Sequence, residues 1–420
     1  MMSGVAWAQS SLPLSVAQAN SVFEEAVRMS AQDAGSLWGV SLYGPMLIVD
    51  RETRRAAANE SVSFFRAEDD VFVGVLPDSV GIANTAVDWN GRRWTMLMWP
   101  LPDDSIARKS LVAHELWHRI QGDLGLPSGS APNLHLGTRD GRVWMQLEWR
   151  ALKAALRGSG DERLPTVRDA LTFRQRRHSI FPDAEREERV LLMHEGLAEY
   201  TGYALAGEAH EACRERAADA LERAAGAATF VRTFAYPTGA AYGLLLDEHA
   251  PAWREGLSSQ DDMVELLGRA VGFDPAEVAE DDLARVAGRY GGQALMAAED
   301  RLEMRRKERL EDQRRRYVHG PTLTLGFIRM NVQFDPGGVD ALDDIGSVYA
   351  SMRLTDVWGT LTVTQGALIP SDWGSVIVPA PIDTAGGRVE GDGYALDLAE
   401  GWNLVPGERE GDYRVARVEE

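Results

Sequence analysis

The sequence has almost no cysteine, no long apolar run and no local excess of basic charge. Cys213 is the only cysteine, so the chain can form neither an intrachain disulfide nor a cysteine-based metal site. We interpret Cys213 as inert. No stretch of about 18 apolar residues occurs, so we predict no transmembrane helix. Lys and Arg number 44 against 64 Asp and Glu, giving a net charge of −20. This balance argues against a nucleic-acid partner, because phosphate contacts require clustered cations.

Two stretches stand out from this background. Residues 301–316 are dense in Arg but interleaved with Glu and Asp, which is typical of a solvated helix with i,i+4 ion pairs. Residues 1–10 contain Ala6-Trp7-Ala8, the A-x-A form of a signal-peptidase site, without a basic or long apolar segment before it. We expect export to the periplasm or the outside of the cell if this is the end of a longer signal peptide. Otherwise we expect a cytoplasmic protein.

Length and patterning indicate several parts. The 420 residues exceed one ordinary core, and 45% hydrophobic with 26% charged residues is a globular composition. We predict an α+β protein in which residues 1–102 form a mixed α/β layer, residues 103–319 are mainly helical, and residues 320–420 form a small all-β domain. We expect the last helical stretch to break near Gly291.

The motif His114-Glu115-Leu116-Trp117-His118 lies within a predicted helix, Ile106–Gln121, that contains no Gly or Pro. Residues four apart share one helix face, so His114 and His118 can bind one metal ion, conventionally zinc, at roughly 2.0–2.1 Å. Glu115 lies one step around the helix, where it can accept a proton from the attacking water without being a ligand. The pattern predicts a zinc site that needs a third ligand.

A second motif, Met193-His194-Glu195-Gly196-Leu197-Ala198-Glu199-Tyr200, lies in a predicted helix spanning residues 183–206. With the first motif it resembles the gluzincins, the zinc peptidases with a thermolysin-like or aminopeptidase-N-like catalytic domain. The resemblance implies that Glu195 is the third ligand and that Glu199 hydrogen-bonds a ligand histidine, most plausibly His114. Two alternatives remain: Glu148 is the ligand, or Glu195 is simply solvated.

The interval between the two motifs is longer than is typical of the gluzincins, because Glu195 lies 77 positions after His118. We therefore expect about two extra helices between the two motifs. Burying Glu195 and Glu199 on one helical face would be costly unless a cation and a donor compensate them. The small residues Gly196 and Ala198 would allow the two helices to approach closely.

A third segment, which begins Tyr236-Pro237-Thr238-Gly239, resembles the aminopeptidase-N-like segment whose tyrosine stabilises an oxyanion. The resemblance gives this role to Tyr236, with Tyr242 as the alternative. The family's amine-binding glutamate has no counterpart, because the nearest stretch, residues 81–84, contains no acid. An endopeptidase or a specialised substrate therefore fits better than an aminopeptidase.

The strand predicted over Arg93–Trp99 follows an Asn90-Gly91 hairpin signal and leads into the first motif helix. In several zinc peptidase folds such a strand forms the edge of a sheet above the metal, where extended substrate can pair. We expect the same position here.

Together these observations predict a zinc metallopeptidase with one zinc per chain and a peptide or protein substrate. His114, His118 and Glu195 would bind the metal, and Glu115 and Tyr236 would act on the substrate. One alternative is a catalytically inactive zincin-fold module that binds a partner or is structural. The other is a zinc hydrolase acting on a non-peptide amide.

Overall fold

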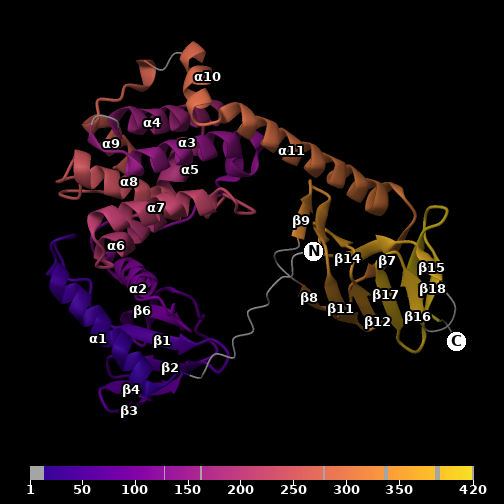
Figure 1. The fold of residues 1–420 in the computed structure, drawn as a ribbon. Helices are drawn as coiled ribbons and strands as arrows, with labels where there is room; N and C mark the ends of the chain where they lie inside the picture. Colours follow the sequence, from indigo (N-terminus) through magenta and orange to yellow (C-terminus); the bar gives the residue numbers. More distant parts are fainter. Residues whose placement is uncertain are drawn as a thin grey trace. The chain divides into compact units, whose positions relative to one another are not determined.

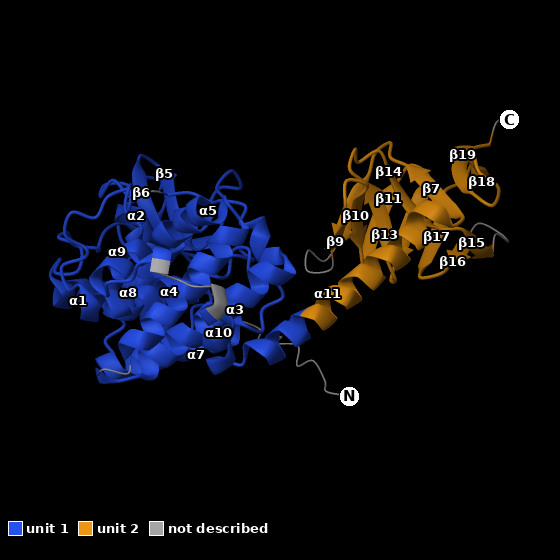
Figure 2. Cartoon of the chain, turned by 90° about the horizontal axis from the view of Figure 1, so that it is seen from above, with its two compact units in different colours: residues 1–299 blue, residues 300–420 orange. Residues whose placement is uncertain are grey.

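A computed structural model of the chain describes residues 14–126, 128–160, 163–277, 280–334, 339–383 and 388–418. The signal-peptide prediction for residues 1–10 lies outside these ranges. The chain forms two compact units, Met1–Glu299 and Asp300–Glu420, coloured separately in Figure 2. The architecture is α+β with an all-β region in the C-terminal part, as predicted. No helix among the described residues is long and apolar enough to span a membrane.

The first unit begins with one helix and a sheet and continues almost entirely as helices (Figure 1). The strands of its sheet are β1 (Met46–Asp50), β2 (Arg55–Ala58), β3 (Arg66–Glu68), β4 (Val71–Val75), β5 (Thr85–Trp89) and β6 (Arg92–Trp99). The helical segments up to the second unit are α1 (Val16–Asp33), α2 (Ser105–Ile120), η1 (Leu134–Gly137), α3 (Arg139–Arg157), α4 (Arg163–Ile180), α5 (Ala184–Leu191), η3 (Leu192–Gly196), α6 (Leu197–Leu205), α7 (His210–Ala224), α8 (Ala235–His249), α9 (Met263–Ala270), η4 (Pro275–Glu277), α10 (Glu280–Arg289) and the start of α11 (Gly292–Arg314). The predicted break falls at Gly291, whose φ is +69°.

The sheet has the strand order β3-β4-β2-β1-β6-β5, in which only β1 and β6 run parallel. The expected edge position of the strand Arg93–Trp99 is therefore wrong, because β6 lies between β1 and β5. Asn90 and Gly91 both adopt positive φ, which is the hairpin geometry that folds β5 back along the free side of β6. The edge strand nearest the first motif is β5.

The two faces of this sheet bury different clusters. Alternate residues such as Ile48 and Leu97 face the core formed with α1 and α2, whereas Val49 and Met96 face a smaller cluster closed by loops. Helix α2 contacts β5 and β6 on one side and α6 on the other, so it lies between the sheet and the remaining helices (Figure 1). The first motif is consequently held inside the unit.

Close backbone contacts position the helices around α2. A Cβ atom built at Gly202 of α6 would lie 2.6 Å from the carbonyl oxygen of Ser110 in α2. A Cβ atom at Gly239 of α8 would lie 2.1 Å from the Cα atom of Gly196, so α8 packs directly against the second motif. Helices α3 and α4 occupy the interval between the two motifs, where two extra helices were predicted.

The second unit is a β-sandwich preceded by the rest of α11 and the π-helical turn η5 (Arg315–His319). Its two sheets have the orders β18-β19-β7-β14-β13-β10-β9 and β15-β16-β17-β12-β11-β8, and both contribute to one apolar core. The strands are β7 (Thr322–Gly326), β8 (Asn331–Phe334), β9 (Val339–Leu342), β10 (Gly346–Tyr349), β11 (Met352–Asp356), β12 (Gly359–Val363), β13 (Ala367–Pro370), β14 (Ser375–Pro379), β15 (Pro381–Asp383), β16 (Arg388–Gly391), β17 (Tyr394–Leu398), β18 (Trp402–Pro406) and β19 (Tyr413–Arg417).

The Arg-rich stretch, residues 301–316, forms two kinds of ion pair. Arg306 and Lys307 pair with Glu303 along the helix, as predicted. Arg309 lies 3.1 Å from the carboxylate of Asp340, so the helix is also tied to the strands that follow it.

The Gly196–Gly239 contact generates a stability prediction. Gly239→Ala should lower the free energy of unfolding by about 1–3 kcal/mol, because the new methyl group meets backbone that cannot rotate away. Gly288→Ala is the matched control: it lies in α10 with open space around it and should raise stability by about 0.5–1 kcal/mol. Urea unfolding of both variants would test this. Equal changes in the free energy of unfolding for the two variants would contradict the close contact between Gly239 and Gly196.

Candidate metal centre and its cleft

The first motif lies on a helix that forms as the sequence predicts. The Asp104 side chain accepts a hydrogen bond from the backbone N–H of Ala107 at 2.8 Å, which caps α2 at its start. His114, Glu115 and His118 all lie on the buried part of this helix. The chain therefore places two imidazoles and a carboxylate in its interior.

The second motif brings Glu195 to these histidines. Its Oε2 atom lies 3.5 Å from His114 Nε2 and 3.4 Å from His118 Nε2, and the two Nε2 atoms are 3.1 Å apart. One ligand atom from each residue falls within a group spanning no more than 4.8 Å. The structure thus brings together the three residues predicted as metal ligands.

Acceptors outside this group fix the orientation of both rings. Glu199 Oε2 lies 3.0 Å from His114 Nδ1, the contact expected from the sequence. Gln121 Oε1 lies 3.2 Å from His118 Nδ1, and the Gln121 amide donates in turn to the Met193 carbonyl oxygen at 3.1 Å. Because both Nδ1 atoms face acceptors, each ring carries a proton there, and Nε2 is the nitrogen left to bind a metal ion.

This arrangement fits a metal ion. The two Nε2 atoms face each other at 3.1 Å, and the Glu195 carboxylate adds negative charge at the same point, so either a shared proton or a metal ion is favoured there. Two imidazole nitrogens and one carboxylate oxygen are a donor set typical of catalytic zinc, which leaves a coordination position open. Glu199 and Gln121 supply the outer hydrogen bonds that orient such ligands.

The pKa values follow from the same crowding of carboxylates. Burial alone would lower the pKa of His114, but its contacts with Glu195 and Glu199 outweigh burial and raise it to about 10. Burial raises the pKa of Glu195, but the two histidines reverse this and hold it well below its usual range. The centre therefore favours a positive charge at the meeting point of these side chains.

Glu115 differs from the other carboxylates of the centre. Its Oε2 atom is buried and has no hydrogen-bond partner among the described residues. Burial raises its pKa, and the opposing attraction of His114 and His118 is smaller. A carboxylate in this state is able to accept a proton in the interior.

The centre opens into a cleft of about 700 Å³, whose walls include Ala83, Asn84 and Thr85 beside the β5 edge. Tyr236, at the start of α8, also lines the cleft and stacks on the His114 ring at 5.9 Å between centroids. Burial and the neighbouring Glu195 raise the pKa of Tyr236, so its hydroxyl keeps its proton. It can donate a hydrogen bond in the cleft.

Sequence reasoning missed His194. Its ring packs edge-on against His118, with centroids 4.7 Å apart, and its Nδ1 lies 3.2 Å from the backbone nitrogen of Gly129. Burial and the neighbouring His118 lower the pKa of His194 to about 4, so the ring is neutral near pH 7. The position of His194 directly before Glu195 in the second motif could have indicated that it lies near the metal centre.

The segment η3, which carries His194 and Glu195, is a π-helix rather than an α-helix. It interrupts the helix predicted over residues 183–206, with α5 before it and α6 after it. Single π-helical turns inside α-helices are frequent at functional sites. No sequence pattern indicated this interruption.

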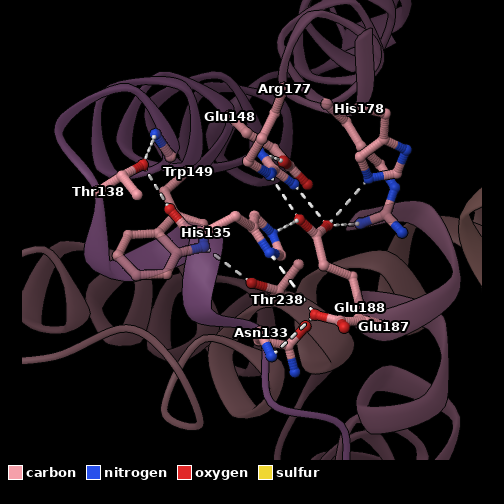
Figure 3. Close-up of polar contacts among 12 residues, drawn as sticks. Asn133, His135, Thr138, Glu148, Trp149, Arg177, His178, Glu187, Glu188 and Thr238 are labelled. Atoms are coloured by element: carbon pink, nitrogen blue, oxygen red, sulfur yellow. Dashed lines mark hydrogen bonds and ion pairs between the residues drawn. The ribbon is translucent and has the colours of Figure 1, made fainter. Parts of the chain in front are cut away.

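Glu148 and Tyr242, the alternative ligand and the alternative oxyanion donor, lie in a separate buried cluster. The Glu148 carboxylate lies 2.7 Å from Arg177 and accepts a hydrogen bond from the Tyr242 hydroxyl at 2.7 Å. Arg177 also donates two bonds of 2.7 Å to Glu188, which Figure 3 shows together with His135 and His178. The structure therefore places neither residue with the two motif histidines.

The remaining sequence interpretations concern Cys213 and residues 81–84. Burial raises the pKa of the Cys213 thiol to about 11, which favours the inert interpretation. Asn84 lines the cleft, but its Oδ1 atom accepts a hydrogen bond from the Met98 N–H at 2.7 Å. It supplies no acid for a substrate amine.

No protein-family model matches the chain, and neither does a curated protein or a solved structure.

Glu195 lies with the two motif histidines and Glu148 lies with Arg177, so the choice between them as the metal ligand can be tested. Glu195→Ala should lose zinc, because two histidines alone hold it weakly. Glu148→Ala should keep about one zinc per folded chain but unfold about 3–5 kcal/mol more easily, because it leaves the buried Arg177 charge partly uncompensated. Metal analysis and urea unfolding separate the two effects. Zinc lost from the folded Glu148→Ala protein and kept by Glu195→Ala would reverse the assignment.

Proposed function

We propose that this protein is a zinc metallopeptidase with a gluzincin-type catalytic unit. One zinc per chain would be held by His114 and His118 of α2 and Glu195 of η3. The observation that carries the proposal is the convergence of His114 Nε2, His118 Nε2 and Glu195 Oε2 within a group spanning no more than 4.8 Å. Every residue of this constellation lies in the first compact unit.

A zinc ion bound there would polarise a peptide carbonyl group and make water a stronger acid. Glu115 then acts as the general base, since its side chain lines the cleft beside the metal ligands and can take a proton from the attacking water. The same carboxyl group passes the proton to the amine nitrogen as the peptide bond breaks. Its raised pKa supports holding the proton between these two steps.

Tyr236 supplies a donor on the other side of the reacting carbonyl. Its hydroxyl keeps its proton and lies in the same cleft as His114 and Glu195. A fixed donor of this kind stabilises the oxygen on which negative charge develops. Tyr242 does not take this role, because its hydroxyl is bonded to Glu148 outside the cleft.

Glu115 also favours catalysis over a purely structural metal. A metal that only stabilises the fold gains nothing from an unpaired buried carboxylate beside it, and burying one is costly. A base in that position is useful when water must be deprotonated. The inactive binding module remains the alternative that the following experiment addresses.

Glu115→Gln should keep zinc and the folded state but lose peptide hydrolysis, because an amide cannot accept the proton of water. Digestion of a peptide library, with metal analysis of the same sample, measures both properties. Glu24→Gln on the exposed face of α1 is the control and should remain active. Activity of Glu115→Gln equal to wild type would remove Glu115 as the base. An inactive wild type would favour the binding module.

Tyr236→Phe should lower kcat by about 100-fold with little change in KM, since the donor acts on charge that develops in the transition state. Tyr242→Phe is its matched control. That change should leave kcat near wild type but destabilise the fold by about 1–3 kcal/mol, because the buried Glu148 loses a donor. Steady-state kinetics on one cleaved peptide would distinguish the two tyrosines. Equal kcat values for the two variants would contradict the role given to Tyr236.

A further inference from the structure

The charges that line the cleft are unevenly distributed. Its acidic lining residues among those described are Glu115, Glu195 and Glu199, and all three belong to the metal centre already described. Its two cationic side chains are Arg216 and Arg232. In a chain with a net charge of −20, this cleft is a place where a substrate anion meets fixed positive charge.

Arg232 lies directly beside the metal centre. Its Nη2 atom is 3.6 Å from Glu195 Oε1, while the other oxygen of that carboxylate faces the two histidines. The Arg232 side chain is 60% exposed, yet the short segment that carries it lies between the fully buried Phe230 and Phe234. The backbone of Arg232 is thus anchored while its guanidinium group remains accessible.

Arg216 is already engaged by its neighbours. Its Nε atom donates to Glu208 at 2.6 Å, its Nη1 atom to Ser110 at 3.4 Å, and its guanidinium lies 3.7 Å from the Tyr203 ring centre. Arg232 is held less tightly: it pairs loosely with Glu195 and also lies beside the Tyr236 hydroxyl, with 60% of its side chain exposed. When Glu195 shares its charge with a bound cation, the guanidinium of Arg232 is left to bind another anion.

We propose that Arg232 selects substrates carrying a carboxylate next to the bond that is cleaved. This inference rests on the proposed peptidase function and specifies its substrate class. A single carboxylate, that of Glu195, separates the guanidinium from the histidine nitrogens, so the recognised group belongs to a residue flanking the scissile bond. Arginine binds carboxylates through two parallel hydrogen bonds. The carboxylate belongs either to an acidic side chain or to a free C-terminus.

The test uses the parent peptide that wild-type enzyme cleaves fastest in a library. Four derivatives carry Glu or Gln beside the cleaved bond and a free or amidated C-terminus. Their kcat/KM values are measured with wild type, and their binding to zinc-loaded Glu115→Gln protein is followed by fluorescence anisotropy. The side-chain pair and the C-terminal pair separate the two sources of the carboxylate.

Wild type should prefer at least one carboxylate-bearing peptide by about 10-fold, in both cleavage and binding. Arg232→Ala should lose this preference, and Arg232→Glu should reverse it in favour of the peptides that lack the carboxylate. Both variants should retain zinc and the wild-type unfolding temperature. Arg285→Ala, a 67% exposed residue of an ion pair outside the cleft, removes the same charge and should keep the preference.

The outcomes separate this inference from the proposed function. Cleavage of all four peptides at equal rates would keep the peptidase assignment and overturn the role of Arg232. A library left intact by the zinc-loaded wild type would remove the peptidase assignment itself. Loss of zinc from Arg232→Ala would also overturn the inference, because Arg232 would then act by holding Glu195 in place.

Discussion

The convergence of two imidazole nitrogens and one carboxylate oxygen on a single point is the constraint on which this site depends. His114 and His118 are held with their Nε2 atoms facing each other by acceptors on their opposite sides, Glu199 and Gln121. Neither ring can turn without breaking its hydrogen bond to Glu199 or Gln121. The fold therefore keeps both Nε2 atoms directed at the Glu195 carboxylate, where a proton or a metal ion can be shared among the three side chains. The placement of α2 between the sheet and α6 serves this arrangement.

The insertion between the two motifs needs its own support, because it separates residues that must act together. Helices α3 and α4 fill this interval, and their buried charges meet those of α5. Glu188 of α5 accepts hydrogen bonds from Arg174 and Arg177 of α4, which fixes α5 against the inserted helices. Breaking such buried pairs is costly, so this cluster braces the start of the helix that carries Glu195.

Local periodicity explains what the sequence could predict. The face shared by His114 and His118 follows from residues one helical turn apart, whereas the Glu199–His114 contact was expected from the resemblance to the gluzincins. The two extra helices followed from the length of the interval between the motifs. The shared histidine face and the inserted helices needed only the helix repeat and the chain length.

Non-local pairing explains what the sequence could not predict. The Asn90-Gly91 turn was recognised, but the side of β6 on which β5 lies depends on pairing across the whole sheet. The hydrogen bond from Gln121 to Met193 joins residues 72 positions apart. His194 and Arg232 reach the cleft through tertiary packing that no short motif encodes.

The π-helical segment η3 determines the directions in which Glu188 and Glu195 point from one continuous helix. Glu188 and Glu195 are seven positions apart, just under two turns of a regular α-helix, and would then share one face. The wider turn at residues 192–196 rotates the later residue away from the earlier one. Glu188 thus faces arginines supplied by the protein, while Glu195 faces histidines that leave its charge to be balanced by an ion. One helix can in this way hold a permanently neutralised carboxylate and a carboxylate available for a ligand, without mixing the two environments.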